Sequence, residues 1–447
     1  MKYIQEPSKK IPVMAETDVL VVGSGPSGLS AAIASAREGV DTMLVERYGC
    51  FGGNITQAMV ESIGWYRHEG TVESEGIGLE FEAQTRQFGG ERKEPQSISQ
   101  VLEADIFKCV SDKMVEEAGI YKFLHCLGVE ALSEGDRITG VITESKEGRQ
   151  AILAKRVIDC TGDADIAFRA GAACNKAPRN KLEGVSVSFG CSGVNRDRFL
   201  EYIKKNPGNL GQWASQTAGK EENLFSPYLC EPFAKARQNG EIPENVLTGG
   251  YWSSLTDTGE ATYLNMVYML GLDPTDLKDL TFAEIEGRKQ AMLAIKALRK
   301  YTPGFENARL RTFGSSLGTR ESRKIEGRHS MTGDEVKNQA KFEDSIGIFP
   351  EFLDAYGVVI IPTTGRYFQV PYGIMVPKEI DNLLVAGRCV SGDRISHAAL
   401  RQMMCCTVTG QGAGVAAAVS VKDGVPTGEV NIDHVQKALK KQGVRIN

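Results

Sequence analysis

The feature that most constrains the fold is a glycine-rich turn near the start of the chain. Residues 19–30 read VLVVGSGPSGLS, an apolar run followed by Gly23, Gly25 and Gly28 in G-x-G-x-x-G spacing. In such a turn the first glycine permits a sharp strand-to-helix bend, the second lets backbone approach a pyrophosphate, and the third lets helix and strand pack closely. The phosphates then lie at the positive end of the helix. The motif alone is a weak indicator, so its surroundings decide its value.

The flanking sequence has the order of a βαβ unit. Residues 19–22 are a short apolar run suited to a buried parallel strand, and residues 26–38 are alanine-rich and end before a glycine, which predicts the crossover helix. A second strand over 42–45 ends at Glu46, 18 residues after Gly28. A dinucleotide-binding fold needs an acceptor for a ribose hydroxyl in this region. We therefore predict a dinucleotide-binding unit with Glu46 as that acceptor.

Composition limits the classes of partner. At 447 residues the chain is long enough for two or three domains, and its 41% hydrophobic and 24% charged residues are ordinary for folded domains. A net charge of −5 with no long basic run disfavours nucleic acid, because phosphate binding requires a clustered positive face. The N-terminus lacks a signal-peptide core, and no stretch approaches the roughly 18 apolar residues of a membrane span. We expect a cytoplasmic homo-oligomer without a membrane partner.

The cysteines argue against a metal centre. Ten cysteines include no C-x-x-C pair, which disfavours iron–sulfur clusters and structural zinc. We therefore expect no metal site and a set of buried thiols in a reducing compartment.

Strand and helix patterns continue beyond the first unit. Apolar residues recur at helical spacing over 100–118, and the segments 121–132, 140–144 and 151–158 alternate or run apolar between glycine-rich turns, as strands do. The region from about 180 to 310 differs, because it mixes helix and loop with many prolines and aromatic residues, Trp213 among them. We interpret that region as a separate substrate-side part.

The end of the chain returns to the opening pattern. Residues 382–387 indicate a short buried strand with a glycine stop, and residues 409–421 indicate a helix of small residues. These segments hold too few strands for an independent domain, so we interpret them as completing the first one. This predicts an α/β, Rossmann-like domain in two pieces, 1–175 and 366–447, with an α+β substrate domain inserted at 176–365.

Several stretches together resemble the glutathione-reductase-type FAD proteins and, within them, a broad family of FAD-dependent oxidoreductases. The stretches are VVGSGPSGLSAAIASAREG, VERYGCFGGN, VIDCTGDADIAFRAGA, LGTRESRKIEG, and VPYGIMVPKEIDNLLVAGRCVSG followed by TGQGAGVAAA. They cover roughly residues 15–60, 120–175 and 310–420 in the family's order. The resemblance implies a GR2-type FAD-binding domain and an enzyme that transfers a hydride between flavin and a small organic substrate.

The resemblance also implies residues for the cofactor. The three glycines of the first turn carry the pyrophosphate and Glu46 the adenosine ribose, while the turn from Gly410 to Gly414 opens the last helix. The positive end of that helix then faces the flavin pyrimidine ring, where it stabilises negative charge on the reduced flavin. The implied set is Gly23, Gly25, Pro26, Ser27, Gly28, Glu46, Arg47, Gly52, Gly53, Asn54, Thr161, Gly162, Asp163, Gly387, Arg388, Gly412 and Ala413.

The chain departs from the family pattern at two positions. Many members of the wider superfamily carry an acidic residue directly after the alanine-glycine of the last strand, where this chain has Arg388, although GRC is common in the narrower family. The narrower family often has a histidine five residues after GRC, where this chain has Arg394. No second G-x-G-x-x-G unit follows a strand, so we expect electrons to pass through substrate, oxygen or an external donor or acceptor.

Candidate catalytic residues lie in two segments. His397 and Arg401 stand four apart, which places them on one helix face, and their spacing resembles the H-G-A-N-R stretch of fumarate-reductase-type flavoproteins, whose arginine grips a substrate carboxylate. Counting from GRC also supports Arg401, but not His397. Arg320 is the third candidate, in the charged segment GTRESR, which either faces the substrate or salt-bridges a domain junction.

The main hypothesis leaves two alternatives open. One is a fumarate-reductase-like ene-reductase or dehydrogenase that acts across a C–C bond. The other is an FAD electron-transfer subunit of a larger complex. The sequence specifies neither the substrate nor the direction of transfer.

Overall fold

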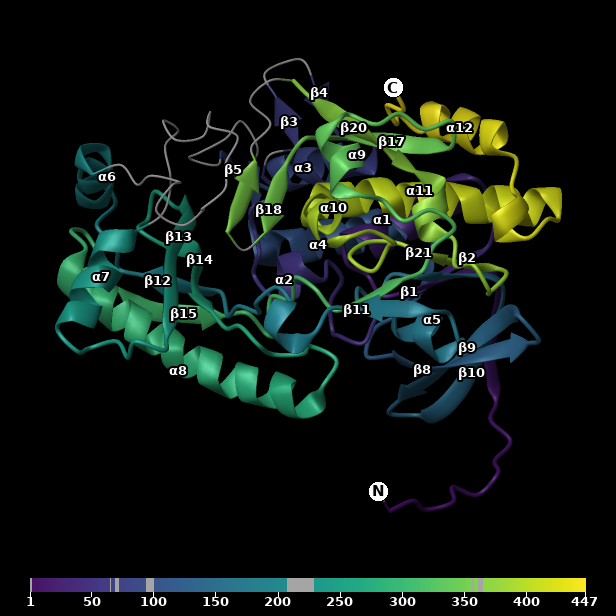
Figure 1. Ribbon diagram of the computed structural model, residues 1–447, viewed down its shortest axis with the longest axis horizontal. Helices are drawn as coiled ribbons and strands as arrows, with labels where there is room; N and C mark the ends of the chain where they lie inside the picture. The colour runs from purple at the N-terminus through teal and green to yellow at the C-terminus, as the bar shows by residue number, and fades with distance from the viewer. Residues whose placement is uncertain are drawn as a thin grey trace.

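Two lobes make up the chain, each with its own sheet and hydrophobic core (Figure 1). The computed structural model describes residues 2–64, 66–68, 72–93, 100–206, 229–355, 357–360 and 365–447. Trp213 lies outside the described residues.

The first lobe is built on a seven-stranded sheet in the order β7-β2-β1-β10-β9-β8, with β21 beside β10. Its parallel strands are β1 (Val13–Val22), β2 (Thr42–Val45), β7 (Tyr121–Phe123), β10 (Gly148–Asp159) and β21 (Leu383–Val385). The strands β8 (Leu127–Glu134) and β9 (Arg137–Ser145) add an antiparallel hairpin. Because β21 pairs with β10, the end of the chain completes the sheet that its beginning starts, and the Rossmann-like α/β prediction is confirmed.

Two helices of small residues lie against each other beside this sheet, α1 (Pro26–Arg37) and α11 (Met403–Asp423). A Cβ on Gly410 would stand 2.1 Å from the backbone oxygen of Ser27, and one on Gly414 would stand 2.2 Å from that of Ala31. Only glycine therefore permits this approach. Among the described residues, α11 is also the one helix long and apolar enough to cross a membrane, but 94% of that window is buried inside the protein.

The second lobe carries an antiparallel sheet in the order β13-β14-β12-β15. Its elements are β12 (Phe189–Ser192), α6 (Arg196–Lys205), α7 (Cys230–Gln238), β13 (Leu247–Leu255), β14 (Ala261–Tyr268), α8 (Leu277–Tyr301) and β15 (Arg309–Phe313). Its core runs from Val185 to Leu317.

The segment after that core packs with the first lobe, so the inserted lobe is shorter than the expected 176–365. Ile346 and Phe349 on β17 (Ser345–Pro350) belong to the first lobe's core, and β17 pairs with β20 (Tyr367–Pro371).

The remaining elements are α2 (Asn54–Gln57), β3 (Arg67–His68), β4 (Val72–Glu73), α3 (Ile77–Gln87), β5 (Glu91–Lys93), β6 (Gln100–Leu102), α4 (Ala104–Glu117), α5 (Asp165–Arg169), β11 (Cys174–Lys176), β16 (Arg323–Ile325), α9 (Gly333–Lys337), β18 (Leu353–Ala355), β19 (Val358–Ile360), α10 (Arg394–Leu400) and α12 (Ile432–Lys441).

Two element boundaries differ from the sequence expectations. The expected strand 121–132 is two strands, β7 and β8, separated by a turn in which His125 has a φ of 55°. The expected helix 409–421 begins six residues earlier, at Met403. A helix buried on all sides shows no amphipathic period, so the pattern of apolar residues does not reveal where it starts.

Candidate active site

The turn between β1 and α1 opens into a cavity of about 270 Å³, here called the glycine-turn cavity. Gly23 has a φ of 93°, and a Cβ on Gly28 would stand 1.8 Å from the oxygen of Gly23. Gly25 is the N-cap of α1 and has no side chain to cap it, and a Cβ there would stand 3.9 Å from the Cα of Gly53. The first backbone N–H groups of α1 therefore form a site for an anion.

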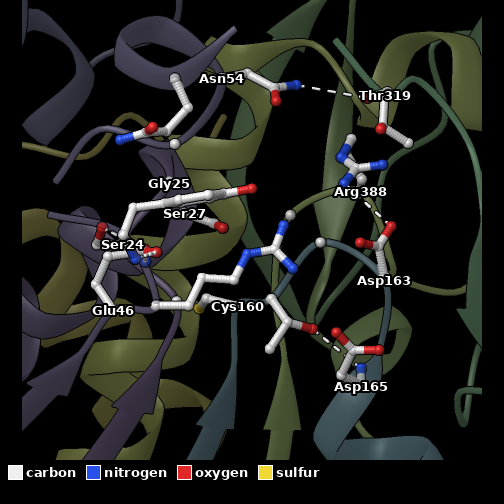
Figure 2. Close-up of a pocket in the computed structure, with 18 of the residues that line it drawn as sticks. Ser24, Gly25, Ser27, Glu46, Asn54, Cys160, Asp163, Asp165, Thr319 and Arg388 are labelled. Atoms are coloured by element: carbon white, nitrogen blue, oxygen red, sulfur yellow. Dashed lines mark hydrogen bonds and ion pairs between the residues drawn. The ribbon is translucent and has the colours of Figure 1, made fainter. Parts of the chain in front are cut away.

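Glu46 forms one wall of this cavity at the end of β2 (Figure 2). Its Oε2 accepts hydrogen bonds from the backbone N of Ser24 at 2.8 Å and from the Ser24 hydroxyl at 2.6 Å, while Oε1 accepts from the backbone N of Tyr48 at 2.9 Å. A carboxylate has about four acceptor positions. Glu46 thus fixes the turn and retains one position for a ribose hydroxyl.

The opposite wall holds an ion pair between Arg388 and Asp163, with Nη2 of Arg388 3.2 Å from Oδ1 of Asp163 (Figure 2). Many members of the wider superfamily carry an acidic residue directly after the last strand, where this chain has Arg388. The acidic partner, Asp163, here follows the neighbouring strand β10. Nη1 of Arg388 is buried and has no hydrogen-bond partner among the described residues.

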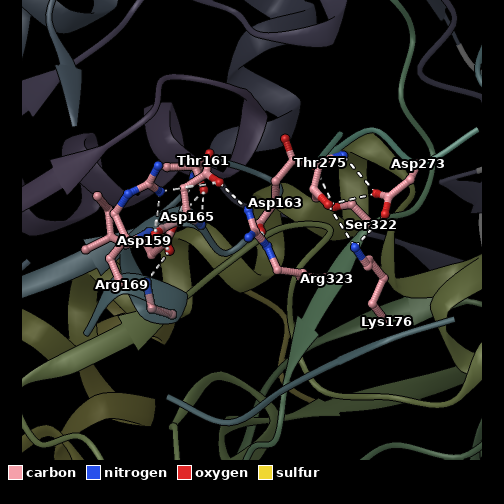
Figure 3. A network of polar contacts seen from close by, with 12 residues as sticks. Asp159, Thr161, Asp163, Asp165, Arg169, Lys176, Asp273, Thr275, Ser322 and Arg323 are labelled. Carbon is pink, nitrogen blue, oxygen red and sulfur yellow. Dashed lines mark hydrogen bonds and ion pairs between the residues drawn. The ribbon is translucent and has the colours of Figure 1, made fainter. Parts of the chain in front are cut away.

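A polar network holds the loop after β10 in place (Figure 3). Buried Asp159 accepts hydrogen bonds from the backbone N and hydroxyl of Thr161 at 3.0 and 2.7 Å, and from two backbone N atoms of α5. Burial raises the pKa of Asp159. Arg323 bridges to Asp165 at 2.5 Å and donates to the backbone oxygen of Asp163 at 2.8 Å. Arg323 of GTRESR therefore connects β16 to the loop after β10 and to α5.

Most residues expected to bind the cofactor line this cavity. They are Gly23, Gly25, Pro26, Ser27, Glu46, Arg47, Gly53, Asn54, Thr161, Gly162, Asp163, Gly387 and Arg388. Gly28 and Gly52 lie behind the lining and shape the backbone there. The lining also includes residues that the sequence analysis missed, among them Ser24, Tyr48, Gln57, Gly128 and Thr319.

The expectation that Gly412 and Ala413 contact the cofactor is wrong. Both lie within α11, fully enclosed by packing, and a Cβ on Gly412 would meet the side chain of Ile346. The end of α11 that borders the cavities is its true N-terminus at Met403. Because the helix was expected to begin at residue 409 rather than at Met403, the residues expected at its N-terminus, Gly412 and Ala413, lie within the helix instead.

A second cavity of about 550 Å³ lies between the lobes, here called the interlobe cavity. It shares five lining residues with the glycine-turn cavity: Asn54, Thr319, Arg388, Arg401 and Met403. The described residues that line it include four arginines, two carboxylates and three tyrosines: Arg237, Arg320, Arg388, Arg401, Glu183, Asp354, Tyr251, Tyr263 and Tyr268.

Arg401 and Arg320, two of the three catalytic candidates, both line the interlobe cavity. Nη2 of Arg401 is 3.1 Å from Oδ2 of Asp354, and its buried Nε has no hydrogen-bond partner among the described residues. The Arg320 guanidinium stacks on the Tyr268 ring, 4.7 Å from its centroid, and Nη1 donates to the backbone oxygen of Gly184 at 3.0 Å.

His397 does not reach either cavity, so its assignment as a catalytic group is corrected. Its side chain is 2% exposed, and Nε2 lies 3.1 Å from the backbone oxygen of Arg320. Burial holds the pKa of His397 well below its ordinary value, so the ring is neutral. A neutral ring must donate through Nε2 to bond a carbonyl. His397 therefore positions Arg320.

The sequence profile of FAD-dependent oxidoreductases matches residues 18–439. The chain belongs to this family. Its cofactor is FAD, and the protein is an enzyme. The residues present fit that cofactor, because an uncapped helix end, the Glu46 acceptor and two arginine nitrogens without a hydrogen-bond partner among the described residues surround two adjacent cavities.

Relatives of this FAD-dependent oxidoreductase cover only part of it. It is 32% identical over 259 residues to the thiamine thiazole synthase of Methanococcus vannielii, which spans 54% of this chain and 85% of that one. It is 30% identical over 168 residues to the soluble pyridine nucleotide transhydrogenase of Chromohalobacter salexigens, at 34% of this chain and 33% of that one. A solved structure of a geranylgeranyl bacteriochlorophyll reductase-like protein from Thermoplasma acidophilum aligns with a TM-score of 0.49 and 13% identity, covering 96% of this chain and 82% of that one.

Proposed function

We propose that this enzyme transfers a hydride between FAD in the glycine-turn cavity and a small anionic organic substrate in the interlobe cavity. When bound, FAD supplies a ring that accepts or donates a hydride. The observation that carries the proposal is that the two cavities are adjacent and share the lining residues Asn54, Thr319, Arg388, Arg401 and Met403. A substrate in the interlobe cavity can thereby reach the cofactor.

The charges of the interlobe cavity support an anionic substrate. Four arginines face two carboxylates among its described lining residues. Guanidinium groups bind planar carboxylates through two parallel hydrogen bonds. Arg401 stands where the cavities join, and Arg320 stands on the wall of the second lobe. Together they would orient a carboxylate or carbonyl group of the substrate.

Tyr268 lies in direct contact with Arg320, one of these two arginines. Its ring supports the Arg320 guanidinium, and its hydroxyl donates to Oε2 of Glu183 at 3.2 Å. Burial raises the pKa of Tyr268, so the phenol keeps its proton at neutral pH. Because that proton is donated to Glu183, Tyr268 would support the position of Arg320 rather than donate to the substrate.

The test is an anaerobic screen of the FAD-loaded enzyme. We expect at least one small hydroxy acid, amino acid or oxo acid to bleach the oxidised flavin spectrum, or to restore it after chemical reduction. Neutral analogues in which an amide replaces the carboxylate are the matched controls and should react far more slowly. Admitting oxygen then separates an oxidase, which recovers rapidly, from a dehydrogenase. Equal rates for acids and their amides would contradict the proposed anionic substrate.

A further inference from the structure

Two of the four arginines that line the interlobe cavity form no ion pair with a carboxylate of the described residues. Arg388 and Arg401 are paired with Asp163 and Asp354. No carboxylate oxygen of a described residue lies within the 4.0 Å of an ion pair from Arg237 or Arg320, although both line the cavity. Arg237 is half-buried, and Asp354 and Glu183 act on Arg320 only from beyond ion-pair distance, so each guanidinium can still bind an anionic group of a ligand directly. These two side chains therefore mark positions for anionic groups.

Arg237 is held with its remaining donors available. It comes from α7, and its Nη2 donates to the backbone oxygen of Val246 at 3.1 Å and to the Thr248 hydroxyl at 2.7 Å. A guanidinium has five N–H donors, so three remain. Fixing one nitrogen in this way reduces the conformational entropy that anion binding would cost.

The fold brings Arg237 and Arg320 to the same end of one strand pair. Thr248, which holds Arg237, pairs across the sheet with Val267. The next cross-strand pair joins Leu247 to Tyr268, on which Arg320 stacks. Tyr268, Leu247 and Thr248 all line the cavity. Both guanidinium groups line the interlobe cavity near this end of the strand pair, whereas Arg401 and Arg388 also border the glycine-turn cavity.

We propose that Arg237 forms a second anion-binding subsite, so that the substrate carries two acidic groups. The inference rests on the proposed function and adds the substrate class to it. One acidic group is held beside Arg320 and Arg401 near the cofactor. The other is held by Arg237, at the part of the cavity formed by α7 and β13.

The experiment measures the binding of carboxylates to the oxidised, FAD-loaded enzyme through the change in flavin absorbance. The probes are straight-chain dicarboxylates from malonate to adipate, each compared with the monocarboxylate of equal carbon number. The variants are Arg237→Gln, Arg320→Gln and, as a control on the same lobe, Arg299→Gln, whose side chain is exposed on α8. FAD content is matched throughout.

In the wild type and in Arg299→Gln, we expect one dicarboxylate to bind at least tenfold more tightly than its monocarboxylate. Arg237→Gln should abolish this difference and leave monocarboxylate binding unchanged, whereas Arg320→Gln should weaken both. Monocarboxylate binding with no advantage for any dicarboxylate, or an advantage that survives in Arg237→Gln, would overturn the subsite and leave the proposed function standing. Failure of every carboxylate to bind would overturn both.

Discussion

The carboxylate of Glu46 both accepts hydrogen bonds from Ser24 of the glycine-rich turn and lines the glycine-turn cavity. We expect Glu46→Ala to weaken FAD binding about tenfold to a hundredfold, because a hydrogen bond to a charged acceptor contributes about 1.5–3 kcal/mol. Fluorescence titration of the apoprotein with FAD measures this. Glu16→Ala, on the exposed start of β1, is the control and should bind normally. Unchanged affinity in Glu46→Ala would reject the ribose role.

Arg401 tests the chemistry separately from cofactor binding. Lysine keeps the charge of Arg401 but loses the planar fork that contacts Asp354 and faces both cavities. We expect Arg401→Lys to bind FAD normally and to slow flavin reduction by substrate by about one to three orders of magnitude, or about 1.4–4 kcal/mol. Stopped-flow reduction at saturating substrate is the measurement. Wild-type rates would show that Arg401 is structural.

Glu61 makes stability depend on pH at the contact between the lobes. Its side chain is 1% exposed and accepts hydrogen bonds from the backbone N of Ala104 at 3.0 Å and from the Thr262 hydroxyl at 2.5 Å. Burial raises the pKa of Glu61 to about 7, against the opposing effects of those hydrogen bonds and of Arg92. The folded state therefore prefers the protonated form, and this contribution is lost as the pH rises from the unfolded pKa through about 7.

Glu61→Gln should remove this pH dependence, because the amide does not ionise, while its oxygen can accept from the backbone N of Ala104 and its NH2 can donate to the Thr262 hydroxyl. Relative to the variant, we expect the wild type to lose about 3 kcal/mol of unfolding free energy between pH 4.5 and pH 8, since one pKa unit corresponds to about 1.4 kcal/mol. Denaturant unfolding at several pH values measures the difference. Parallel pH profiles of the two proteins would show that Glu61 ionises normally.

At the scale of elements, the contact between α1 and α11 sets the position of the helix end in the glycine-turn cavity. In Gly414→Ala the new Cβ meets the backbone oxygen of Ala31, whereas in Gly412→Ala it meets the end of the Ile346 side chain, which can move. We expect Gly414→Ala to cost about 1–3 kcal/mol of stability and to lower FAD retention, and Gly412→Ala to cost less. Thermal unfolding and FAD content measure both. Equal losses would show that backbone contact between the helices is unimportant.

At the scale of the whole molecule, the proposed FAD cavity opens at the glycine-rich turn of the first lobe, and residues of both lobes line the interlobe cavity. We expect purified protein to be yellow and to release FAD, rather than FMN or NAD, on denaturation. Removing FAD should lower the melting temperature, since a ligand at a hundred times its Kd stabilises the folded state by about 2.7 kcal/mol. Adding FAD, but not FMN, should restore it. Folded protein that cannot be loaded with FAD would contradict the cofactor assignment.

The sequence by itself determined the β1-α1-β2 unit, and the resemblance of several stretches to FAD proteins indicated its cofactor. Strand and helix periods, the three glycines and Glu46 lie within a short stretch, where local geometry alone decides which backbone forms and which side chain ends each strand. It also made Arg401 and Arg320 candidates, Arg401 through its spacing from His397 and from GRC, and Arg320 through its place in the charged segment GTRESR.

Only the tertiary structure decided which of these groups reach the cavities. His397 and Arg401 share a helical spacing, but packing against the Arg320 backbone buries the histidine and leaves the arginine at the junction. Tyr268 and Arg237 come from strands and helices of the other lobe, where nothing in the local sequence relates them to the cofactor. The physical reason is that side-chain exposure depends on contacts between segments distant in the chain, and periodicity contains no information about those contacts.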